Sequence, residues 1–347
     1  MDKVLDIQIE EALKAYRASG VEDQVDYQKF YLYSIVTHST AIEGSTVTEI
    51  ENQLLFDEGI AAKGRSLTEQ MMNVDLKDAY LYAFRTASEN PTYTPQLLQQ
   101  LAALVMRRTG SEYSTIAGHF DSSKGEFRLC NVSAGIGGRS YLAYNKVPRA
   151  VDDFCKWLNE EIGKTDKINI ATCYRLSFEA HFRLVTIHPW VDGNGRTTRL
   201  VMNMIQRQLG LIPSIVRKED KGEYIQSLVD SRENNDSTIA QDVMLRHHIA
   251  NLSRRVLQYQ GNDTVNTQSD TVNNTANANN DTVKGLKKSL QKVYTAILNN
   301  PEITHSEIME TLHISESTAK RATRNLKKLG YITRDGSDKT GRWIILK

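Results

Sequence analysis

The sequence is poor in the features that mark disulfide-rich, metal-binding or membrane-spanning proteins. Its 347 residues include only three cysteines, Cys130, Cys155 and Cys173, whose odd number and wide spacing fit neither a disulfide framework nor a zinc site. No apolar run approaches the roughly 18–20 residues of a membrane span. The first residues also lack the basic stretch and apolar core of a secretion signal. These absences favour a cytoplasmic protein with no membrane partner.

The chain also lacks a strong overall charge. It carries 43 Lys and Arg residues against 42 Asp and Glu, and 40% of its residues are hydrophobic. This composition is ordinary for a globular protein, and the length allows two or three domains. The balance is uneven along the chain, because basic residues outnumber acidic ones in the last sixty or so positions.

Helical patterns dominate the sequence. Apolar residues recur at helical spacing in a series of segments separated by glycine or proline, namely 6–18, 28–41, 49–56, 69–87, 95–108, 151–162, 171–186 and 197–209. Thr94 followed by Pro95 is a favoured helix start. The sequence therefore predicts a mainly α fold, with an N-terminal helical region at 1–110 and a core at 111–260.

One stretch, from His188 to Arg199, combines a titratable base, a carboxylate, a glycine-rich turn and two guanidiniums. It reads HPWVDGNGRTTR and lies between two helical patterns. Pro189 ends the first pattern, because proline has no N–H and clashes with the preceding helical turn. The stretch is thus a loop leading into a helix N-terminus, where free N–H groups and the helix dipole favour an anion.

Each residue type in this loop suits phosphate chemistry. Gly193 and Gly195 allow backbone amides to approach a phosphate closely, and Asn194 tolerates a left-handed backbone and adds a donor. Arg196 and Arg199 supply planar forks that match phosphate oxygens.

The two remaining groups suit catalysis. Asp192 is a hard oxygen ligand for Mg²⁺ held jointly with phosphates. His188 has an ordinary pKa near neutrality, as proton abstraction requires. Singly, each residue has a plain structural explanation as a turn, a structural histidine or a surface charge. In this order they predict a nucleotide site.

The string resembles the signature of Fic-domain proteins, His-Pro-Phe-x-Asp/Glu-Gly-Asn-Gly-Arg-x-x-Arg, with Trp190 replacing the phenylalanine. The resemblance implies a helical catalytic domain that transfers AMP from ATP to a protein hydroxyl. It implies that His188 deprotonates the target, that Asp192 holds Mg²⁺ and that the phosphates rest on the anion hole and arginines, Gly193, Asn194, Gly195, Arg196 and Arg199.

A second segment, Ser39 to Gly44, resembles the family's inhibitory motif Ser/Thr-x-x-x-Glu-Gly/Asn. Ser39 and Glu43 are four apart and share one face of a helix expected at about 28–44. The resemblance implies that Glu43 pairs with Arg199 and occupies the space of the γ-phosphate. Without the main motif, a solvated glutamate would be the better explanation of this short pattern.

A third segment, from 125–128 through 136–142, is rich in glycine and short extended runs. In Fic proteins the corresponding β-hairpin, the flap, captures the target by strand addition. This resemblance assigns target docking to four residues, Ile136, Gly137, Gly138 and Tyr141; an ordinary connecting loop is the alternative. It also aligns Tyr224 with a tyrosine of the nucleotide pocket, although a single tyrosine at that spacing could equally belong to the core.

The composition changes at 261–284, which is rich in asparagine and poor in apolar residues and so reads as a flexible linker. Residues 285–347 resemble a winged helix-turn-helix domain, with helices expected at 286–298, 306–312 and 316–329 and strands at 331–334 and 342–346. The third helix presents four basic residues for nucleic-acid contact, Lys320, Arg321, Arg324 and Lys328. Protein docking is the alternative, since the fold alone does not establish function.

Three hypotheses follow. The first is an autoinhibited protein adenylyltransferase that uses ATP and Mg²⁺ and acts on a hydroxyl of a target protein or of itself. The second reverses the direction, with Glu43 activating a water that removes AMP. The third is a nucleotide-sensing, DNA-binding regulator. The sequence leaves open the target, a DNA or protein partner for 285–347, and a homodimer.

Overall fold

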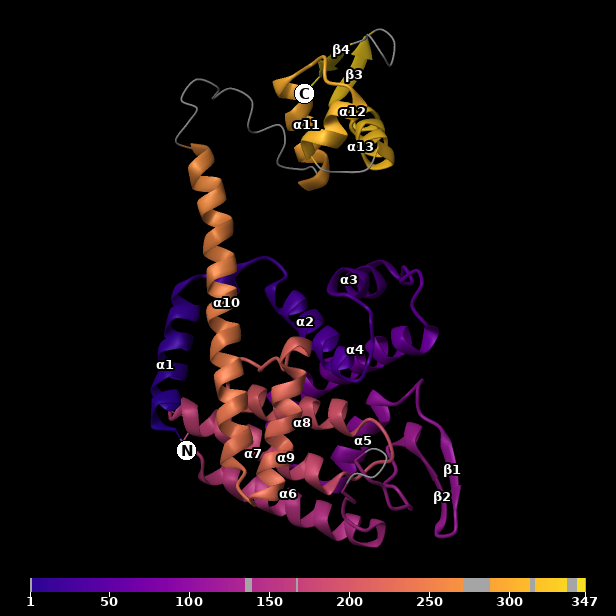
Figure 1. Ribbon diagram of the computed structural model, residues 1–347, viewed down its shortest axis with the longest axis vertical. Helices are drawn as coiled ribbons and strands as arrows, with labels where there is room; N and C mark the ends of the chain where they lie inside the picture. The colour runs from indigo at the N-terminus through magenta and orange to yellow at the C-terminus, as the bar shows by residue number, and fades with distance from the viewer. Residues whose placement is uncertain are drawn as a thin grey trace. The chain divides into compact units, whose positions relative to one another are not determined.

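The structure is a computed structural model that describes residues 2–134, 139–166, 168–270, 288–312, 316–335 and 342–346. The chain divides into two compact units, residues 1–263 and 264–347. The first unit is helical (Figure 1), with α1 (Lys3–Ala18), α2 (Tyr27–Ile42), α3 (Glu49–Glu58), α4 (Leu67–Ser88), α5 (Pro95–Val105), α6 (Val147–Lys164), α7 (Ile170–Ile187), α8 (Asn194–Gln208), α9 (Lys221–Glu233) and α10, which starts at Thr238. The prediction of a mainly helical fold is confirmed.

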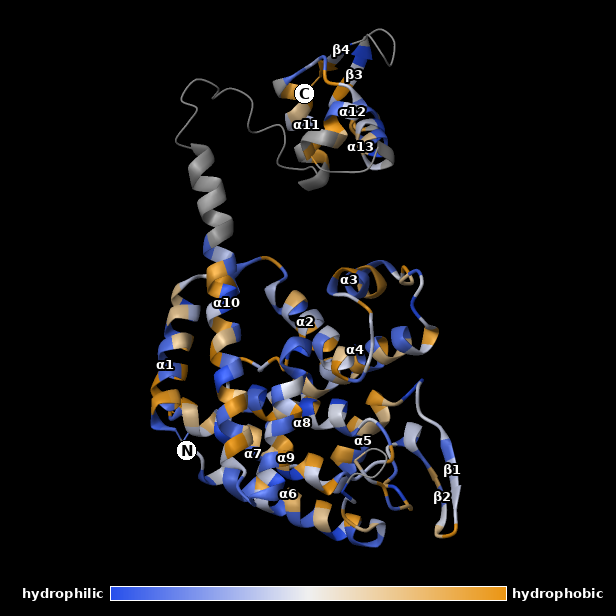
Figure 2. Ribbon diagram, in the orientation of Figure 1, coloured by the Kyte–Doolittle hydropathy of each residue, from blue (hydrophilic) through white to orange (hydrophobic). Residues whose placement is uncertain are grey.

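Local sequence signals account for several helix starts. Pro95 opens α5, and the Thr94 hydroxyl before it accepts a hydrogen bond from the backbone N–H of Leu97 at 3.2 Å. Helices α3 and α4 both begin with a capping box, in which a hydroxyl residue and a glutamate three positions later satisfy each other's free N–H groups. Helix α1 is amphipathic, and Figure 2 shows mixed orange and blue along it.

Helix α8 lies at the centre of the first unit. It packs against α4, α5 and α7, and α2 packs against both α4 and α8. Most side chains of α8 are buried, including Leu200, Val201, Met204 and Ile205. A helix that is buried nearly all round has a position fixed by its neighbours. The loop that precedes α8 therefore rests on a rigid base.

The first β-hairpin lies earlier than the segment predicted for it. Strands β1 (Glu112–Thr115) and β2 (Gly118–Asp121) pair antiparallel after α5. Across this pair Tyr113 and Phe120 stack, with ring centroids 5.1 Å apart, and Gly118 adopts a φ of 129° at the turn. In the predicted flap segment, the structure describes a single antiparallel bridge between Ser133 and Ser140.

The end of the first unit also differs from expectation. Helix α10 runs from Thr238 to Asp270 and so continues into the segment read as a linker at 261–284. A helix that is already formed gains one hydrogen bond for each residue added, which allows it to extend past its packed part. Residues 271–284 lie outside the described residues, and the predicted domain boundaries stay predictions.

The second unit contains α11 (Lys288–Asn299), α12 (His305–Leu312) and α13 (Glu316–Lys328), followed by the antiparallel strands β3 (Ile332–Asp335) and β4 (Arg342–Ile345). Its own small core includes Tyr294, Ile308, Leu326 and Trp343. This is the winged helix-turn-helix arrangement expected from the sequence. In neither unit is any described helix long and apolar enough to cross a membrane.

Candidate active site

The loop between α7 and α8 has the form that the motif predicts. His188 ends α7 in the left-handed region, with φ at 54°, and its backbone N–H donates to the carbonyl of Leu184 at 3.1 Å. Gly193, with φ at 75°, directly precedes α8. A histidine in the left-handed region is uncommon and is held there only by its surroundings. Residues 188–193 therefore form a fixed loop at the N-terminus of a buried helix.

The side chain of Asn194 stabilises this loop by hydrogen bonds to the backbone of Trp190. Its amide oxygen accepts from the backbone N–H of Trp190 at 3.1 Å, and its amide nitrogen donates to the carbonyl of the same residue at 2.8 Å. The indole of Trp190 is 1% exposed and donates to the carbonyl of Gly125 at 3.0 Å. Tryptophan is thus accommodated with its only donor satisfied.

Two glycines of the motif are needed for close approach. A Cβ at Gly193 would lie 2.6 Å from the sulfur of Met106, and a Cβ at Gly195 would lie 2.2 Å from Oε1 of Glu43. At either distance the facing side chain would have to shift to admit a Cβ, and the positive φ of Gly193 also disfavours any other residue there. The carboxylate of Glu43 therefore lies directly against the backbone of the first turn of α8.

Arg199 is buried, at 2% exposure, and holds the segment predicted to be inhibitory. Its Nε donates to the hydroxyl of Ser39 and its Nη2 to the carbonyl of Ser39, both at 2.9 Å. Nη2 also lies 2.5 Å from Oε1 of Glu43. Burial raises the pKa of the Glu43 carboxyl, but the Arg199 charge outweighs it and holds this pKa below its ordinary value. The two groups form a charged pair at the helix N-terminus.

The end of α2 is pinned by a buried network of amides and hydroxyls. Thr40 donates to the side-chain oxygen of Asn73 on α4 at 2.7 Å, and Asn52 on α3 donates to the same oxygen at 2.9 Å. The amide nitrogen of Asn73 donates to the hydroxyl of Ser45 at 3.0 Å. These contacts lie on both sides of Glu43 in the sequence and fix the backbone that carries it.

Arg196 contrasts with Arg199, because much of its guanidinium has no partner. It is 3% exposed, and its Nη2 lies 3.2 Å from the sulfur of Met106 and 3.7 Å from Oδ1 of Asp192. Its Nε and Nη1 are buried and make no hydrogen bond within the part of the chain that the structure describes. Buried unpaired donors of a charged group are costly, which indicates a missing anionic partner.

Asp192 is the carboxylate expected to hold a metal ion. Its side chain is 61% exposed, and Oδ1 accepts a hydrogen bond from the backbone N–H of Gly193 at 2.5 Å. Among the described residues, no three His, Cys, Asp or Glu side chains gather as a ready-made metal site. The donor set at this loop therefore suits an ion that takes most of its ligands from a phosphate substrate and water.

The protonation of His188, the predicted general base, is set by its burial. Burial is the main reason that its pKa falls to about 4, although the carbonyl of Val185, 3.4 Å from Nδ1, acts in the opposite direction. The imidazole is therefore neutral at neutral pH. A proton on Nδ1 facing that carbonyl leaves Nε2 with its lone pair. The ring stacks on Tyr141, with centroids 3.9 Å apart and an interplanar angle of 17°.

A residue to which sequence analysis assigned no role, Arg128, ties this loop to the flap segment. It is fully buried, its Nε donates to the carbonyl of His188 at 2.8 Å, and its backbone N–H donates to the carbonyl of Pro189 at 3.1 Å. Its Nη1 and Nη2 donate to the carbonyls of Cys130 and Leu142, at 2.7 and 2.5 Å. Little in the sequence indicated this role, because Arg128 was visible only as an arginine next to a phenylalanine in a short extended segment.

The remaining predicted site residues are distributed as follows. Tyr141 pairs with the other arm of the flap segment through its N–H and the carbonyl of Val132, at 3.0 Å. Ile136, Gly137 and Gly138 lie outside the described residues. Tyr224 is buried at 1% exposure, and its hydroxyl lies 2.9 Å from Nε2 of His181 and contacts Arg199.

In the second unit, α13 carries the basic residues predicted to contact nucleic acid. Lys320, Arg321 and Arg324 are exposed, whereas the side chain of Lys328 is outside the described part. Three exposed positive charges on the third helix of a winged helix-turn-helix arrangement suit a polyanion.

Comparison with known families agrees with this geometry. The profile of the Fic/DOC family matches residues 92–206, and a profile described as winged helix-turn-helix DNA-binding matches residues 286–333. Among curated proteins, the protein adenylyltransferase Fic of Drosophila erecta is 28% identical over 219 residues, which cover 62% of this chain and 40% of the relative. The protein of the same name from Drosophila melanogaster is 30% identical over 193 residues, covering 54% of this chain and 35% of the relative. The aligned region thus spans well under half of either relative.

Solved structures share the fold at low sequence identity. A Fic-domain-containing signalling protein from Bacteroides thetaiotaomicron superposes with a TM-score of 0.61 at 19% identity, covering 73% of this chain and 97% of that one. A Fic family protein from Desulfovibrio desulfuricans gives 0.58 at 19% identity and covers 98% of this chain and 94% of that one. These similarities concern the fold.

Proposed function

Since this chain is a Fic/DOC-domain protein with a C-terminal winged helix-turn-helix region, we propose that it is an autoinhibited protein adenylyltransferase. Its substrates are ATP and a hydroxyl side chain of a target protein or of the chain itself. One observation carries the proposal above all others. The N-terminus of α8 has one buried arginine with unpartnered donors, Arg196, beside a second, Arg199, that is held by Glu43.

The phosphates of ATP account for the unpartnered donors. The free N–H groups of the first turn of α8 and the close backbone approach at Gly193 and Gly195 suit a polyphosphate. Arg196 would bind through Nε and Nη1, and Arg199 would bind once it is released by Glu43. Asn194 keeps the loop in shape through Trp190. The adenine subsite includes the region of Tyr224 in this proposal.

His188 acts as the general base. It takes the proton of the target hydroxyl on Nε2 while the hydroxyl oxygen forms a bond to the α-phosphorus of ATP. The bond from the α-phosphorus to the bridging oxygen breaks, and pyrophosphate leaves with that electron pair. The product is an AMP ester of the target side chain. Positioning and charge neutralisation supply most of the rate acceleration in such a transfer.

Asp192 would hold Mg²⁺ together with the phosphate oxygens. The ion, when bound, neutralises the charge that develops on the phosphates. The remaining work falls to the protein. Arg128 holds the carbonyl of His188, and so the imidazole, in register with the flap segment. The flap residues Ile136, Gly137, Gly138 and Tyr141 would present the target by strand addition.

Glu43 accounts for the inhibition. Its carboxylate lies against Gly195 and pairs with Arg199, so it competes for the same donors that a terminal phosphate needs. A phosphate brought to this place meets a like charge at van der Waals distance, which is unfavourable in a partly buried site. In this proposal the arrangement of Glu43 and Arg199 is the inhibited state, and activation requires movement of α2 or of the Glu43 side chain.

The position of the label on ATP tests this assignment. The Glu43→Gly variant is incubated with Mg²⁺ and ATP labelled at either the α- or the γ-phosphate, and labelled protein is measured. Adenylyl transfer predicts label from α-labelled ATP alone, and its loss in Glu43→Gly/His188→Ala. Label from γ-labelled ATP would mean phosphoryl transfer and would overturn the proposal.

A second activity at the same site is favoured by one observation. The Glu43 carboxylate, 34% of whose side chain is exposed, lies near enough to His188 to oppose slightly the lowering of the histidine pKa by burial. In that position it could activate a water against an AMP ester. AMP-modified target incubated with wild type and Glu43→Ala tests this: AMP release by the wild type alone supports hydrolysis, and equal release by both excludes a role for Glu43.

The second unit suggests a partner for the whole chain. The exposed Lys320, Arg321 and Arg324 on α13 and the match to a winged helix-turn-helix profile favour duplex DNA. Binding by the full chain should weaken steeply with salt, and Arg321→Ala/Arg324→Ala should reduce the salt dependence by about two phosphate contacts. Binding unaffected by this double substitution would exclude α13 as the contact helix.

A further inference from the structure

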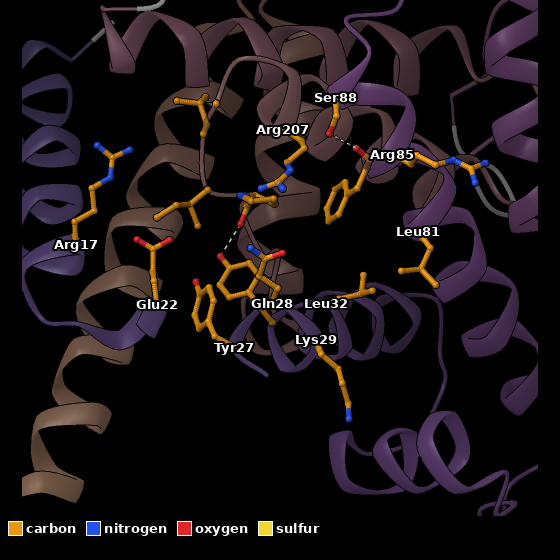
Figure 3. A pocket seen from close by; sticks show the side chains of 16 residues that line it. Arg17, Glu22, Tyr27, Gln28, Lys29, Leu32, Leu81, Arg85, Ser88 and Arg207 are labelled. Atoms are coloured by element: carbon orange, nitrogen blue, oxygen red, sulfur yellow. Dashed lines mark hydrogen bonds between the residues drawn. The ribbon is translucent and has the colours of Figure 1, made fainter. Parts of the chain in front are cut away.

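A cavity of about 570 Å³ lies where α2 packs against α4 and the segment that follows α8. It is distinct from the loop that carries His188, and it is lined by the first half of the helix that carries Glu43 (Figure 3). Its volume falls within the range of small-molecule binding sites. The residues that line it define the chemistry of its ligand.

One part of the lining is apolar and aromatic. Side chains from three elements contribute, among them Tyr27, Tyr31 and Leu32 from α2, Phe84 from α4 and Ile212 from the segment after α8. Flat apolar walls favour a ligand with an aromatic or similarly flat body.

The other part of the lining is cationic, and two of its four cationic side chains form no ion pair within the described part of the chain. Neither guanidinium, of Arg17 or of Arg207, forms an ion pair with any residue that the structure describes, and both side chains are exposed at the mouth of the pocket. Figure 3 shows Arg207 extending towards the middle of the pocket, with the amide of Gln28 nearby. The lining contains one carboxylate, Glu22, at the α1 side. Unpaired guanidiniums beside an apolar wall suit an anionic group on the ligand.

The other two cations of the lining are engaged elsewhere. Lys29 forms an ion pair with Asp57 at 2.9 Å, and the guanidinium of Arg85 lies 5.7 Å from the ring centroid of Tyr82. Figure 3 shows both side chains turning away from the middle of the pocket. The anionic group therefore belongs at the end of the pocket near Arg207.

We propose that this pocket binds a small aromatic anion, and that its ligand holds α2 in the docked, inhibiting position. The pocket exists only while α2 is packed, because α2 forms one of its walls. Tyr31 on that wall donates a hydrogen bond to the carbonyl of Pro213 at 2.6 Å, and so links α2 to the segment that follows α8. A ligand that contacts both α2 and the segment after α8 binds the protein more tightly when α2 is docked than when it is displaced. Such a ligand therefore increases the population of the docked state.

The coupling to the site runs along α2 itself. Glu43, the C-cap residue directly after α2, follows Tyr31 by twelve positions, which corresponds to roughly 18 Å at 1.5 Å per residue. Holding the first half of α2 restricts the displacement of its end, where Glu43 pairs with Arg199. The consequence for AMP transfer rests on the proposed function, whereas ligand binding and the docking of α2 do not.

Binding is tested on the full chain with two fluorescent probes of similar shape, the anion anilinonaphthalene sulfonate and its neutral analogue phenylnaphthylamine. The anion should bind at least about tenfold more tightly. Arg207→Glu should remove this preference and leave the neutral probe unaffected, which also shows that the pocket is intact. Arg149→Glu, an exposed arginine on α6, is the matched control and should change neither affinity. Equal affinity of the two probes, or a preference that survives Arg207→Glu, would overturn the site.

The effect on α2 is tested by amide hydrogen exchange, which does not depend on any enzymatic activity. Saturating anionic probe should slow exchange across residues 27–43 by about threefold or more in the wild type and not in Arg207→Glu. Binding without slower exchange would overturn the coupling. Slower exchange in the wild type, together with failure of Glu43→Gly to transfer AMP, would leave this inference standing and contradict the proposed function alone.

Discussion

Arg199 and Glu43 are 156 positions apart in the sequence, yet Nη2 of the first lies 2.5 Å from Oε1 of the second. Ser39 and Glu43 engage Nε and Nη2 of this guanidinium, so these two donors are not free for another anion. Arg196, three positions earlier on the same helix, keeps unpartnered donors. In the proposed function, Arg196 is therefore the half of the phosphate site that is ready, and Arg199 is the half that is blocked.

Ser39→Ala should relieve the block in part. The substitution removes the hydroxyl that accepts from Nε of Arg199 at 2.9 Å but keeps the backbone carbonyl that accepts from Nη2. A hydrogen bond to a charged group contributes roughly 1.5–3 kcal/mol. Because the Ser39 carbonyl and Glu43 remain bound to Arg199, only part of this energy weakens the block, and incorporation of AMP from α-labelled ATP should rise a few-fold. Ser34→Ala, the same change one and a half turns earlier on α2, is the control, and an equal effect of both would contradict the role of Ser39.

Gly195→Ala should weaken ATP binding even where Glu43 is absent. In the Glu43→Gly background the new Cβ no longer meets the carboxylate, but it still lies 3.0 Å from Nη1 of Arg199 and covers the backbone of the first turn of α8. Calorimetry should show affinity for ATP reduced by about tenfold or more. Gly163→Ala, whose Cβ meets nothing within 4 Å, is the control. Unchanged affinity would remove Gly195 from the phosphate site.

The pH dependence of transfer reports on His188. Burial lowers its pKa to about 4, so the base is already deprotonated at neutral pH and stays so as the solution is acidified. In Glu43→Gly, kcat/KM should therefore remain nearly constant from roughly pH 8 to pH 5.5, whereas a base with an ordinary histidine pKa of about 6.5 would lose about tenfold at the lower limit. A fall of that size, in protein shown by circular dichroism to be folded, would contradict a desolvated base.

Arg128→Lys should impair turnover more than nucleotide binding. Lysine keeps the positive charge but cannot donate at once to the carbonyls of His188, Cys130 and Leu142. In the Glu43→Gly background we expect kcat to fall by about tenfold to a hundredfold, with the KM for ATP little changed. Arg149→Lys on the exposed face of α6 is the control. A parallel rise in KM, or no effect, would argue against a positioning role.

Much of the helical scaffold could be predicted from the sequence because its signals are local. Pro189 interrupts a helical pattern, Pro95 follows a good N-cap residue, and glycines follow several apolar stripes. The motif from His188 to Arg199 is contiguous, so the helical sequence patterns on either side of it predict its position at a helix N-terminus. The contact of Glu43 with Arg199 was expected from family resemblance and not from spacing.

The features that the sequence did not reveal depend on distant partners. Arg128 has its carbonyl partners up to 60 positions away, and no local pattern marks a buried arginine that binds main-chain groups. In the β-hairpin at residues 112–121, Tyr113 stacks on Phe120 across the strand pair. The sequence pattern here is too short to predict that these two rings would pair. Met106 lies against both Gly193 and Arg196 because α5 packs on α8.

The most direct measurement of the central claim is the initial rate of AMP incorporation from α-labelled ATP for three proteins: wild type, Glu43→Gly and Glu58→Gly. Glu58 ends α3 and is exposed, so its substitution makes the same chemical change at a helix end away from the site. Removing the carboxylate that pairs with Arg199 should raise the rate by about tenfold or more, as release of roughly 1.4 kcal/mol requires. Glu58→Gly should match the wild type. Equal rates for all three proteins would contradict inhibition by Glu43.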